Sequence, residues 1–249
     1  EILKLSLIIY LAAWYGGRDE RSKKWSYGMM PFLIILAFVA LLLFLQPDIG
    51  TLIIVSFISL GVYFMAGPSY KQFVGIILVL FLALSVIIVV EPYRFERLKT
   101  FWDPSADPRG ASYQINQSLI SIGSGGLLGV GYNNSSQKQG GFLPEVIGDS
   151  IFAIIAEELG LIGSAFTVGL FGVLCLFLIT IAKNASDKFG ALLVMGINIW
   201  VMSQAFVNIA AISGLVPLTG IPLPFISYGG TAIAVLLSGM GIVFNVAKD

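Results

Sequence analysis

Apolar residues in this chain fall into seven long runs, separated by polar or glycine- and proline-rich segments. A helix needs roughly 20 mostly apolar residues to cross about 30 Å of hydrocarbon, and it satisfies its own backbone groups where lipid offers no partner. The pattern therefore predicts an all-α fold, a polytopic transmembrane helical bundle. The expected spans lie near residues 2–15, 29–46, 50–67, 72–90, 151–182, 190–212 and 226–247.

Basic residues lie mainly in the connections on one side of this bundle. If the spans alternate in direction, that side carries Arg18, Arg21, Lys23, Lys24, Lys71, Lys183, Lys188 and Lys248. By the positive-inside rule it is the cytoplasmic side. Glu1, Asp48 and the connections 91–150 and 213–225 are then expected outside.

The composition agrees with a membrane protein and narrows the chemistry. Of the 249 residues, 57% are hydrophobic and 11% charged, and the mean hydropathy is +0.92, values that a water-soluble globule does not reach. The 14 basic and 14 acidic residues cancel, so no basic patch indicates a nucleic-acid partner. With no histidine and one cysteine, Cys175, disulfides, zinc sites and haem are excluded. The sequence requires no cofactor, and any bound metal must be a hard divalent cation such as Mg²⁺ or Mn²⁺, held by oxygen ligands.

The 91–150 connection contains no spanning run, yet it is too long for a passive link, because loops above about 12–15 residues are usually functional or disordered. It carries several aromatic residues and a turn cluster, DPSADPRG. Its apolar stretch, residues 113–131, is typical of a re-entrant or interfacial helix. We therefore expect a large extracellular loop with structure of its own.

Carboxylates gather at the end of this connection and in the apolar run after it. They are Glu145, Asp149, Glu157 and Glu158. A continuous helix over 151–182 would be about 48 Å long at 1.5 Å per residue, well beyond the length of a span. Its first turns are expected to protrude to the outer headgroup level, where the carboxylates could meet the phosphates of a lipid-linked substrate. The residues that would share a helical face with Asp149 are Phe152, Ala153, Ala156 and Gly160.

Asp149 allows two interpretations. Standing just before the apolar helix, it could serve only as a cap. Facing a cavity at the membrane surface, its carboxylate could act as a general base or hold a divalent cation. We favour the second interpretation, and the two are compatible. Asp48 has the same ambiguity, and Glu1 and Lys4 form either a local ion pair one turn apart or the polar lining of a cavity.

Further groups could bind a phosphorylated substrate. Arg94 and Lys138 are outer cations suited to a pyrophosphate, or else solvated headgroup contacts. The GSGG of residues 123–126, with Gly129 and Gly131, could form a nest of backbone N–H groups, although a flexible re-entrant turn is the simpler interpretation. Ser227 follows three prolines in residues 217–230, where the alternative is a rigid loop with a tight helix contact. No G-x-x-x-x-G-K-[ST] motif supports nucleotide hydrolysis.

Four segments together resemble one family. They are QPDIGT (46–51), YRFERLKTFWDPSADPRGASYQINQSLISIGSGGLLGVGY (93–132), FLPEVIGDSIFAIIAEELGLIG (142–163) and GIPLPFISYGG (220–230). In these motifs the chain is similar to the SEDS family of bacterial cell-wall polymerases, which includes FtsW, RodA and SpoVE. EILK at the start resembles the end of the family's Q-P-S-E-x-x-K motif. NSSQK resembles the FtsW branch, which serves division, more than the RodA branch, which serves elongation.

The resemblance implies a single membrane domain over residues 1–249, whose seven spans match the last seven of a ten-span fold, with the upstream part missing. It implies an inverting peptidoglycan glycosyltransferase in the bacterial cytoplasmic membrane. The implied substrate is lipid II, the undecaprenyl-pyrophosphate-linked precursor, polymerised at the outer face. The implied partners are a class B penicillin-binding transpeptidase and membrane lipids.

The resemblance also assigns site residues. Asp149 falls on the aspartate regarded as essential in the family's T-D-F-I-F segment, which here reads GDSIF. The altered neighbours, Gly148 and Ser150, put the hydrogen bonding around this aspartate in question. The residues expected to bind substrate are Glu1, Lys4, Asp48, Arg94, Gln117, Lys138, Glu145 and Ser227.

Two other functions would use the same residues. A transporter that flips lipid II needs a similar cavity, but transporters tend to carry broken helices near the midplane, whereas the breaks and carboxylates here gather at the outer face. A non-catalytic scaffold of the division machinery needs no reactive carboxylate. Formation of glycan strands from labelled lipid II, and its loss in Asp149→Asn, would favour the enzyme over both.

Overall fold

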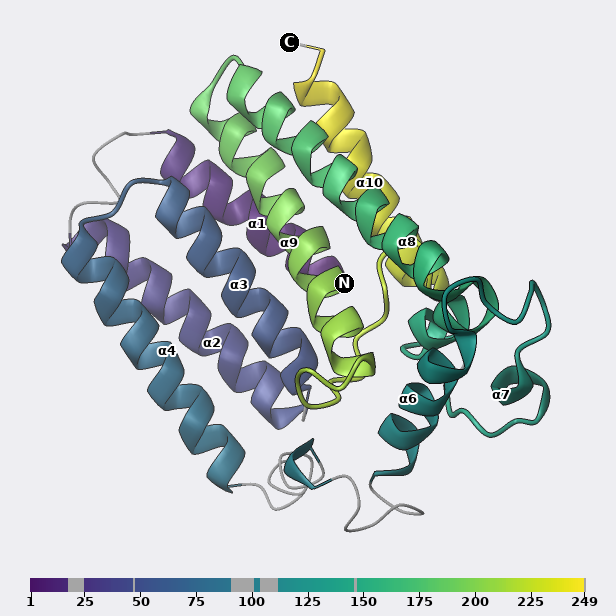
Figure 1. Ribbon diagram of the computed structural model, residues 1–249. Coiled ribbons are helices and arrows are strands. Elements are labelled where there is room, and N and C mark those ends of the chain that lie inside the picture. The colour runs from purple at the N-terminus through teal and green to yellow at the C-terminus, as the bar shows by residue number, and fades with distance from the viewer. Residues whose placement is uncertain (18–24, 47, 91–100, 104–111, 146, 249) are drawn as a thin grey trace. The chain divides into compact units, whose positions relative to one another are not determined.

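The structure is a computed structural model that describes residues 1–17, 25–46, 48–90, 101–103, 112–145 and 147–248. Within these ranges it is all-helical and has no strand (Figure 1). The helices are α1 (Ile2–Gly16), α2 (Met30–Leu45), α3 (Ile49–Met65), α4 (Tyr70–Val90), α6 (Tyr113–Gly125), α7 (Ser136–Gln139), α8 (Ile151–Asn184), α9 (Lys188–Ile212) and α10 (Gly230–Val246), with a π-helical turn at Trp25–Met29. Each of the seven apolar segments predicted from the sequence overlaps one of these helices, so the all-α prediction is confirmed.

Local sequence explains where two of the helices begin. Asp48 caps α3, because its Oδ1 accepts a hydrogen bond from the Thr51 N–H at 2.8 Å, which satisfies one of the free donors of a first turn. Proline stands in the first turn of α2, where its missing N–H removes no helical hydrogen bond.

The chain divides into two compact units. Unit 1 consists of Glu1–Ile87, Leu174–Ser203 and Thr231–Asp249, and unit 2 of Ile88–Val173 and Gln204–Gly230. The second part of α8 and the first part of α9 belong to unit 1, whereas their other parts belong to unit 2. Each unit has its own packed interior.

The interior of unit 1 forms where α3 packs against α1 and α2. The Tyr63 ring on α3 lies with its centroid 5.5 Å from that of Tyr15 on α1 and 4.8 Å from that of Phe32 on α2. All three side chains are buried, and the Tyr15 hydroxyl donates a hydrogen bond to the Gly28 carbonyl at 2.8 Å. A Cβ on Gly196 of α9 would lie 2.6 Å from Ile8 Cγ2, so this small residue allows α9 to approach α1 closely.

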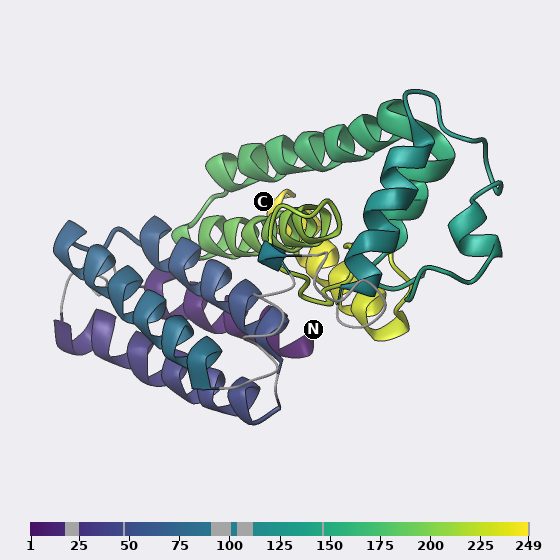
Figure 2. The same cartoon turned by 60° about the horizontal axis from the view of Figure 1, so that its bottom comes forward.

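The interior of unit 2 lies between the first turns of α8, the end of α9 and the loop after α9. Its buried members are Leu143, Phe152, Ala153, Ile154, Ala205, Ile212 and Leu223. Helix α6 runs beside the first turns of α8 (Figure 2). Buried positions on α6 include Ile115, Ser118 and Ser121, so a largely polar face of this helix is turned into protein.

Helix α8 is broken at Gly160, whose backbone has φ 66° and ψ −163°. The continuous helix predicted over 151–182 is therefore wrong. A positive φ is readily adopted by glycine, and a Cβ at this position would lie 2.6 Å from the Leu127 carbonyl oxygen. The sequence shows a glycine in an apolar run, but the segment that packs against it comes from far away in the chain.

That segment, residues 126–131, satisfies the backbone groups that the break leaves without helical partners. Its hydrogen bonds to α8 are Val130 N–H to the Glu157 carbonyl at 2.9 Å, Gly131 N–H to the Glu158 carbonyl at 3.1 Å, Leu161 N–H to the Gly126 carbonyl at 2.9 Å and Ile162 N–H to the Leu127 carbonyl at 3.3 Å. Helix ends in an apolar setting need such partners. The break and the loop after α6 are therefore one structural feature.

By length and composition, two of the described helices could cross a membrane, α8 and α9. The apolar helices α1, α2, α3 and α10 are shorter, with 15–17 residues. The apolar stretch of α8 is 11% buried, against 67% for that of α9. Exposed side chains such as Phe166 and Phe177 are typical of a helix that faces lipid, since soluble proteins rarely expose large apolar surfaces.

Candidate functional site

Asp149 lies two residues before α8 and is half-buried. Both of its carboxylate oxygens accept a hydrogen bond from the Gln114 side-chain amide on α6, at 3.2 Å. The Ser150 hydroxyl donates to Oδ1 at 3.4 Å and accepts from the same Gln114 amide at 3.2 Å. Ser150, not Asp149, is the residue directly before the helix. The Asp149 carboxylate is therefore held by a side chain of another helix.

The backbone of Asp149 is fixed by Asn208 of α9. The Asn208 Nδ2 donates hydrogen bonds to the carbonyls of Asp149 and Ile221, both at 2.7 Å. Asn208 is 1% exposed, so its amide links the start of α8 to the loop after α9 inside the protein. Gly220 of this loop comes close as well, since a Cβ on it would lie 3.9 Å from Asp149 Oδ2.

Ser227 ties the same loop to the residue before Asp149. Its hydroxyl donates to the Gly148 carbonyl at 2.6 Å and accepts from the Leu223 N–H at 2.7 Å. The Tyr228 N–H donates to the Ile147 carbonyl at 2.8 Å. The sequence proposed Ser227 as a substrate ligand or part of a rigid loop, and these hydrogen bonds are those of the rigid loop.

The charge of Asp149 is less favoured than that of an exposed aspartate. Burial raises its pKa, and this is the largest effect. The hydrogen bonds from Gln114 and Ser150 lower the pKa, and the nearby charge of Glu145 raises it. A carboxylate with a raised pKa that is still partly exposed accepts a proton more readily than an ordinary aspartate, as a general base must.

Glu145 shapes the turn that presents Asp149. It is exposed and has a positive φ of 49°, an uncommon conformation for a residue with a side chain. Its carbonyl accepts hydrogen bonds from the N–H groups of Gly148 at 2.9 Å and Ser150 at 3.3 Å. Glu145 therefore acts on Asp149 twice, through the turn and through its charge.

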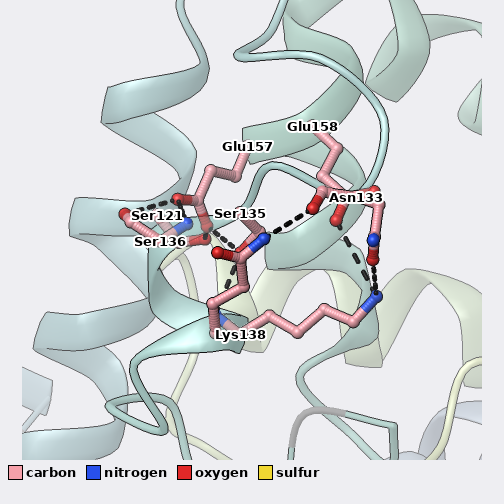
Figure 3. A network of polar contacts seen from close by, with 8 residues as sticks. Ser121, Asn133, Ser135, Ser136, Lys138, Glu157 and Glu158 are labelled. Carbon is pink, nitrogen blue, oxygen red and sulfur yellow. Dashed lines mark hydrogen bonds and ion pairs between the residues drawn. The ribbon is translucent and has the colours of Figure 1, made fainter.

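A second carboxylate of α8, Glu157, is enclosed by serines (Figure 3). Its Oε2 accepts from the hydroxyls of Ser121 at 2.8 Å and Ser135 at 2.6 Å. Its Oε1 accepts from the N–H and the hydroxyl of Ser136, both at 2.9 Å. Glu157 is 1% exposed, so the expectation that it lines the outer headgroup level is wrong.

Glu158 and Lys138 form a weaker polar contact next to this cluster. The Lys138 Nζ lies 3.9 Å from Glu158 Oε1 and donates to Asn133 Oδ1 at 3.2 Å. The Lys138 side chain is 43% exposed and that of Glu158 is 8% exposed. The cation proposed for a pyrophosphate thus rests beside a buried carboxylate in this structure.

The remaining predicted residues lie elsewhere. Glu1 and Lys4 form an ion pair at 2.7 Å, with the Lys4 side chain 2% exposed, and like Asp48 they belong to unit 1. Gln117 is half-buried on α6, one turn beyond the glutamine that contacts Asp149. Arg94 lies outside the described residues.

Sequence reasoning missed the two amides that hold Asp149, Gln114 and Asn208. The indication for Asn208 was its place as a single amide in an apolar run, AFVNIAAI, because polar side chains in such runs are rare and usually have a partner. Gln114 and Gln117 stand three residues apart in the same motif, and no local pattern decides which of them faces Asp149.

Two binding hypotheses gain no support. The N–H groups of Gly129, Val130 and Gly131 donate to protein carbonyls, so they are not available for a phosphate nest. Over the part of the chain that the structure describes, no three carboxylate or cysteine side chains converge on a point where a metal ion could bind.

The chain is similar to known proteins over its whole length. A family model named FTSW_RODA_SPOVE and described as "Cell cycle protein" matches residues 1–249. The "Probable peptidoglycan glycosyltransferase FtsW" of Idiomarina loihiensis is 37% identical, and the match covers 100% of this chain and 61% of the relative. The "Stage V sporulation protein E" of Bacillus subtilis is 36% identical over 100% of this chain and 68% of the relative. The chain thus spans about three fifths to two thirds of these relatives.

A solved structure supports the fold. It is a chain of a peptidoglycan synthase complex, described as coordinating polymerization and crosslinking, with a TM-score of 0.79 and 29% identity. The similarity covers 99% of this chain and 68% of that chain.

Proposed function

Because the chain belongs to the FtsW, RodA and SpoVE family, as its motifs predict, we propose that it acts as a peptidoglycan glycosyltransferase. Its substrate would be lipid II, which it polymerises into glycan strands at the outer face of the bacterial cytoplasmic membrane during division or elongation. The observation that carries the proposal is the Asp149 carboxylate. It is fixed by hydrogen bonds through both its side chain and its backbone, is partly exposed, and has a raised pKa.

The proposed chemistry is an inverting displacement with Asp149 as the general base. A sugar hydroxyl of the acceptor loses its proton to an Asp149 oxygen while it attacks the anomeric carbon of the donor. The bond from that carbon to the diphosphate breaks, and its electron pair leaves with the undecaprenyl diphosphate. An α-linked donor would thereby give a β-linked strand. The amide of Gln114 orients the base, and Asn208 and Ser227 fix the backbone around it.

The departing diphosphate needs positive charge. Lys138 is one candidate, because its side chain is 43% exposed and its Nζ lies 3.9 Å from Glu158 and 3.2 Å from Asn133. Arg94 remains a second candidate. A divalent cation remains a third candidate, and the described residues contain no cluster of three carboxylates that would hold it.

The membrane location and the partner belong to the same proposal. The exposed apolar surface of α8 favours a helix in lipid, and we propose that the seven apolar helices all cross the membrane. The similar chain in the peptidoglycan synthase complex supports a partner that crosslinks the strands, a class B penicillin-binding transpeptidase.

The test is strand formation from labelled lipid II by the purified protein together with that transpeptidase. We expect Asp149→Asn to lower the rate by about 10²- to 10⁴-fold, the contribution of a general base. Asp187→Asn is a matched control, because Asp187 caps α9 by accepting from the Gly190 N–H at 2.8 Å and asparagine caps equally well. Wild-type rates in Asp149→Asn would refute the assignment. Translocation of lipid II by the wild-type protein without any strand would support the flippase instead.

A further inference from the structure

Glu157 is a buried carboxylate whose two oxygens are both fully hydrogen-bonded, and the proposed reaction does not use it. Each of its oxygens accepts two hydrogen bonds, at 2.6 to 2.9 Å (Figure 3). A buried charge is tolerated only when donors or a counter-charge satisfy it. Here three serines replace the counter-ion, since the described cation in this region, Lys138, pairs with Glu158.

The donors to Glu157 come from two different elements. Ser121 belongs to α6, whereas Ser135 and Ser136 stand at the start of α7. The Ser135 hydroxyl also accepts from the Lys138 N–H at 3.0 Å, so it caps α7 while it donates to Glu157. Hydrogen bonds to an ionised acceptor are stronger than neutral ones. The carboxylate therefore joins α6, α7 and α8 at a single point.

This junction lies in register with Asp149. Helix α6 and the first part of α8 run parallel, because Gln114 contacts Asp149, and further along both helices Ser121 contacts Glu157. The Ser121 hydroxyl also lies 3.1 Å from the Ala153 carbonyl, which falls between them. Gln114 and Ser121 are seven residues apart on α6, so both lie on its inner face. A shift of α6 at Ser121 would move the Gln114 amide as well.

We propose that Glu157 is a positioning residue for Asp149, which holds α6 against α8 so that the Gln114 amide stays on the Asp149 carboxylate. The proposal rests on the function proposed above for Asp149. The groups that face Asp149 determine how its pKa should change when the Gln114 hydrogen bond is lost. Gln114 and Ser150 donate to it, Glu145 acts through its charge, and Asn208 and Gly220 are neutral.

The variant that tests the proposal is Glu157→Gln, which keeps the shape of the side chain and turns one acceptor oxygen into a donor amide. That amide would face serine donors. Asp187→Asn is the matched control, because it makes the same change from carboxylate to amide at the cap of α9. We expect Glu157→Gln to lower kcat with little change in KM, and Asp187→Asn to leave both near wild type.

The pH profile distinguishes positioning from general damage. Loss of the Gln114 hydrogen bond removes one of the effects that lower the pKa of Asp149. The rate of strand formation falls at low pH as Asp149 becomes protonated, and this acid limb of the pH profile should move to higher pH in Glu157→Gln. A move of one pH unit would make the rate of the variant about tenfold lower than that of wild type at pH values below the limb. In a Gln114→Ala background, Glu157→Gln should produce no further move. An acid limb that moves equally in both backgrounds, or in neither, would overturn the proposal.

A measurement independent of activity separates this proposal from the proposed function. Amide hydrogen exchange should increase in α6 around Gln114 as well as in residues 133–139 when Glu157 is changed to Gln. Faster exchange confined to residues 133–139 would show a purely local clamp and refute positioning, even if the protein makes no strands. If Glu157→Gln fails to fold, Ser121→Ala removes only the hydrogen bond from α6, and the same outcomes apply to it.

Discussion

Asn208 provides the sharpest test of how the candidate site is held together. Its amide donates to two carbonyls at 2.7 Å, that of Asp149 before α8 and that of Ile221 in the loop after α9. Asn208→Ala leaves both carbonyls without this donor, at a position where the Asn208 side chain is 1% exposed. Each unsatisfied buried group costs about 1–3 kcal/mol, so we expect a loss of about 2–4 kcal/mol in the free energy of unfolding.

For a protein of this size such a loss lowers Tm by about 5–15 °C. The control is Asn198→Ala on the same helix, because the Asn198 amide is also buried but donates to the Cys175 sulfur at 3.6 Å, a weak acceptor. It should lower Tm much less. Thermal unfolding in detergent, followed by intrinsic fluorescence, measures both variants, and strand formation should fall only in Asn208→Ala. If the two variants had equal Tm and both kept full activity, Asn208 would not hold the site as argued.

Two further predictions concern stability. Burial raises the pKa of Asp149, so the folded protein binds a proton at this carboxyl group more tightly than the unfolded chain does. Proton binding therefore stabilises the folded state below the ordinary pKa of aspartate, and this contribution is lost as the pH rises through the raised pKa. Asp149→Asn, which cannot ionise, should therefore have a higher Tm than wild type at neutral pH, and the difference in Tm should become smaller as the pH is lowered. A difference in Tm that grows as the pH is lowered would show that the pKa of Asp149 is not raised. Gly160→Ala should destabilise the protein by about 2 kcal/mol or more, because it places a Cβ at φ 66° against the Leu127 carbonyl. Gly169→Ala, whose Cβ would meet nothing within 4 Å, should be neutral or stabilise by up to about 1 kcal/mol, and equal effects of the two would refute the role of the break.

Hydropathy predicted the helices because the physics of a membrane segment is local. A run of apolar residues long enough for lipid forms a helix wherever its ends are polar, and α9 was expected at 190–212 and found at Lys188–Ile212. The break at Gly160 was not predictable in the same way. Glycine is tolerated inside apolar helices, and the hydrogen bonds that stabilise this break come from residues 126–131, which a local pattern does not place there.

The candidate site shows the same division between local and distant information. Asp149 stood out because several carboxylates are concentrated around the start of an apolar helix in a chain with few charges. Ser227 was named as well, but its hydroxyl proved to bind the Gly148 carbonyl and the Leu223 N–H. The amides of Gln114 and Asn208 carry no charge and no motif of their own, and their roles follow from packing between α6, α8 and α9.

The two carboxylates at the start of α8 explain why a lipid-soluble sequence keeps acidic residues there. Glu157 has four short donors and almost no exposure, so its charge is fully used to join three helices and is closed to a substrate. Asp149 receives longer bonds of 3.2 to 3.4 Å from one amide and one hydroxyl and stays partly open. A carboxylate that the protein satisfies completely is structural, whereas one that it satisfies incompletely retains the capacity to accept a proton. On this argument Glu157 fixes the first turns of α8, so that Asp149, just before the helix, is held in a defined place and its carboxylate remains able to accept a proton.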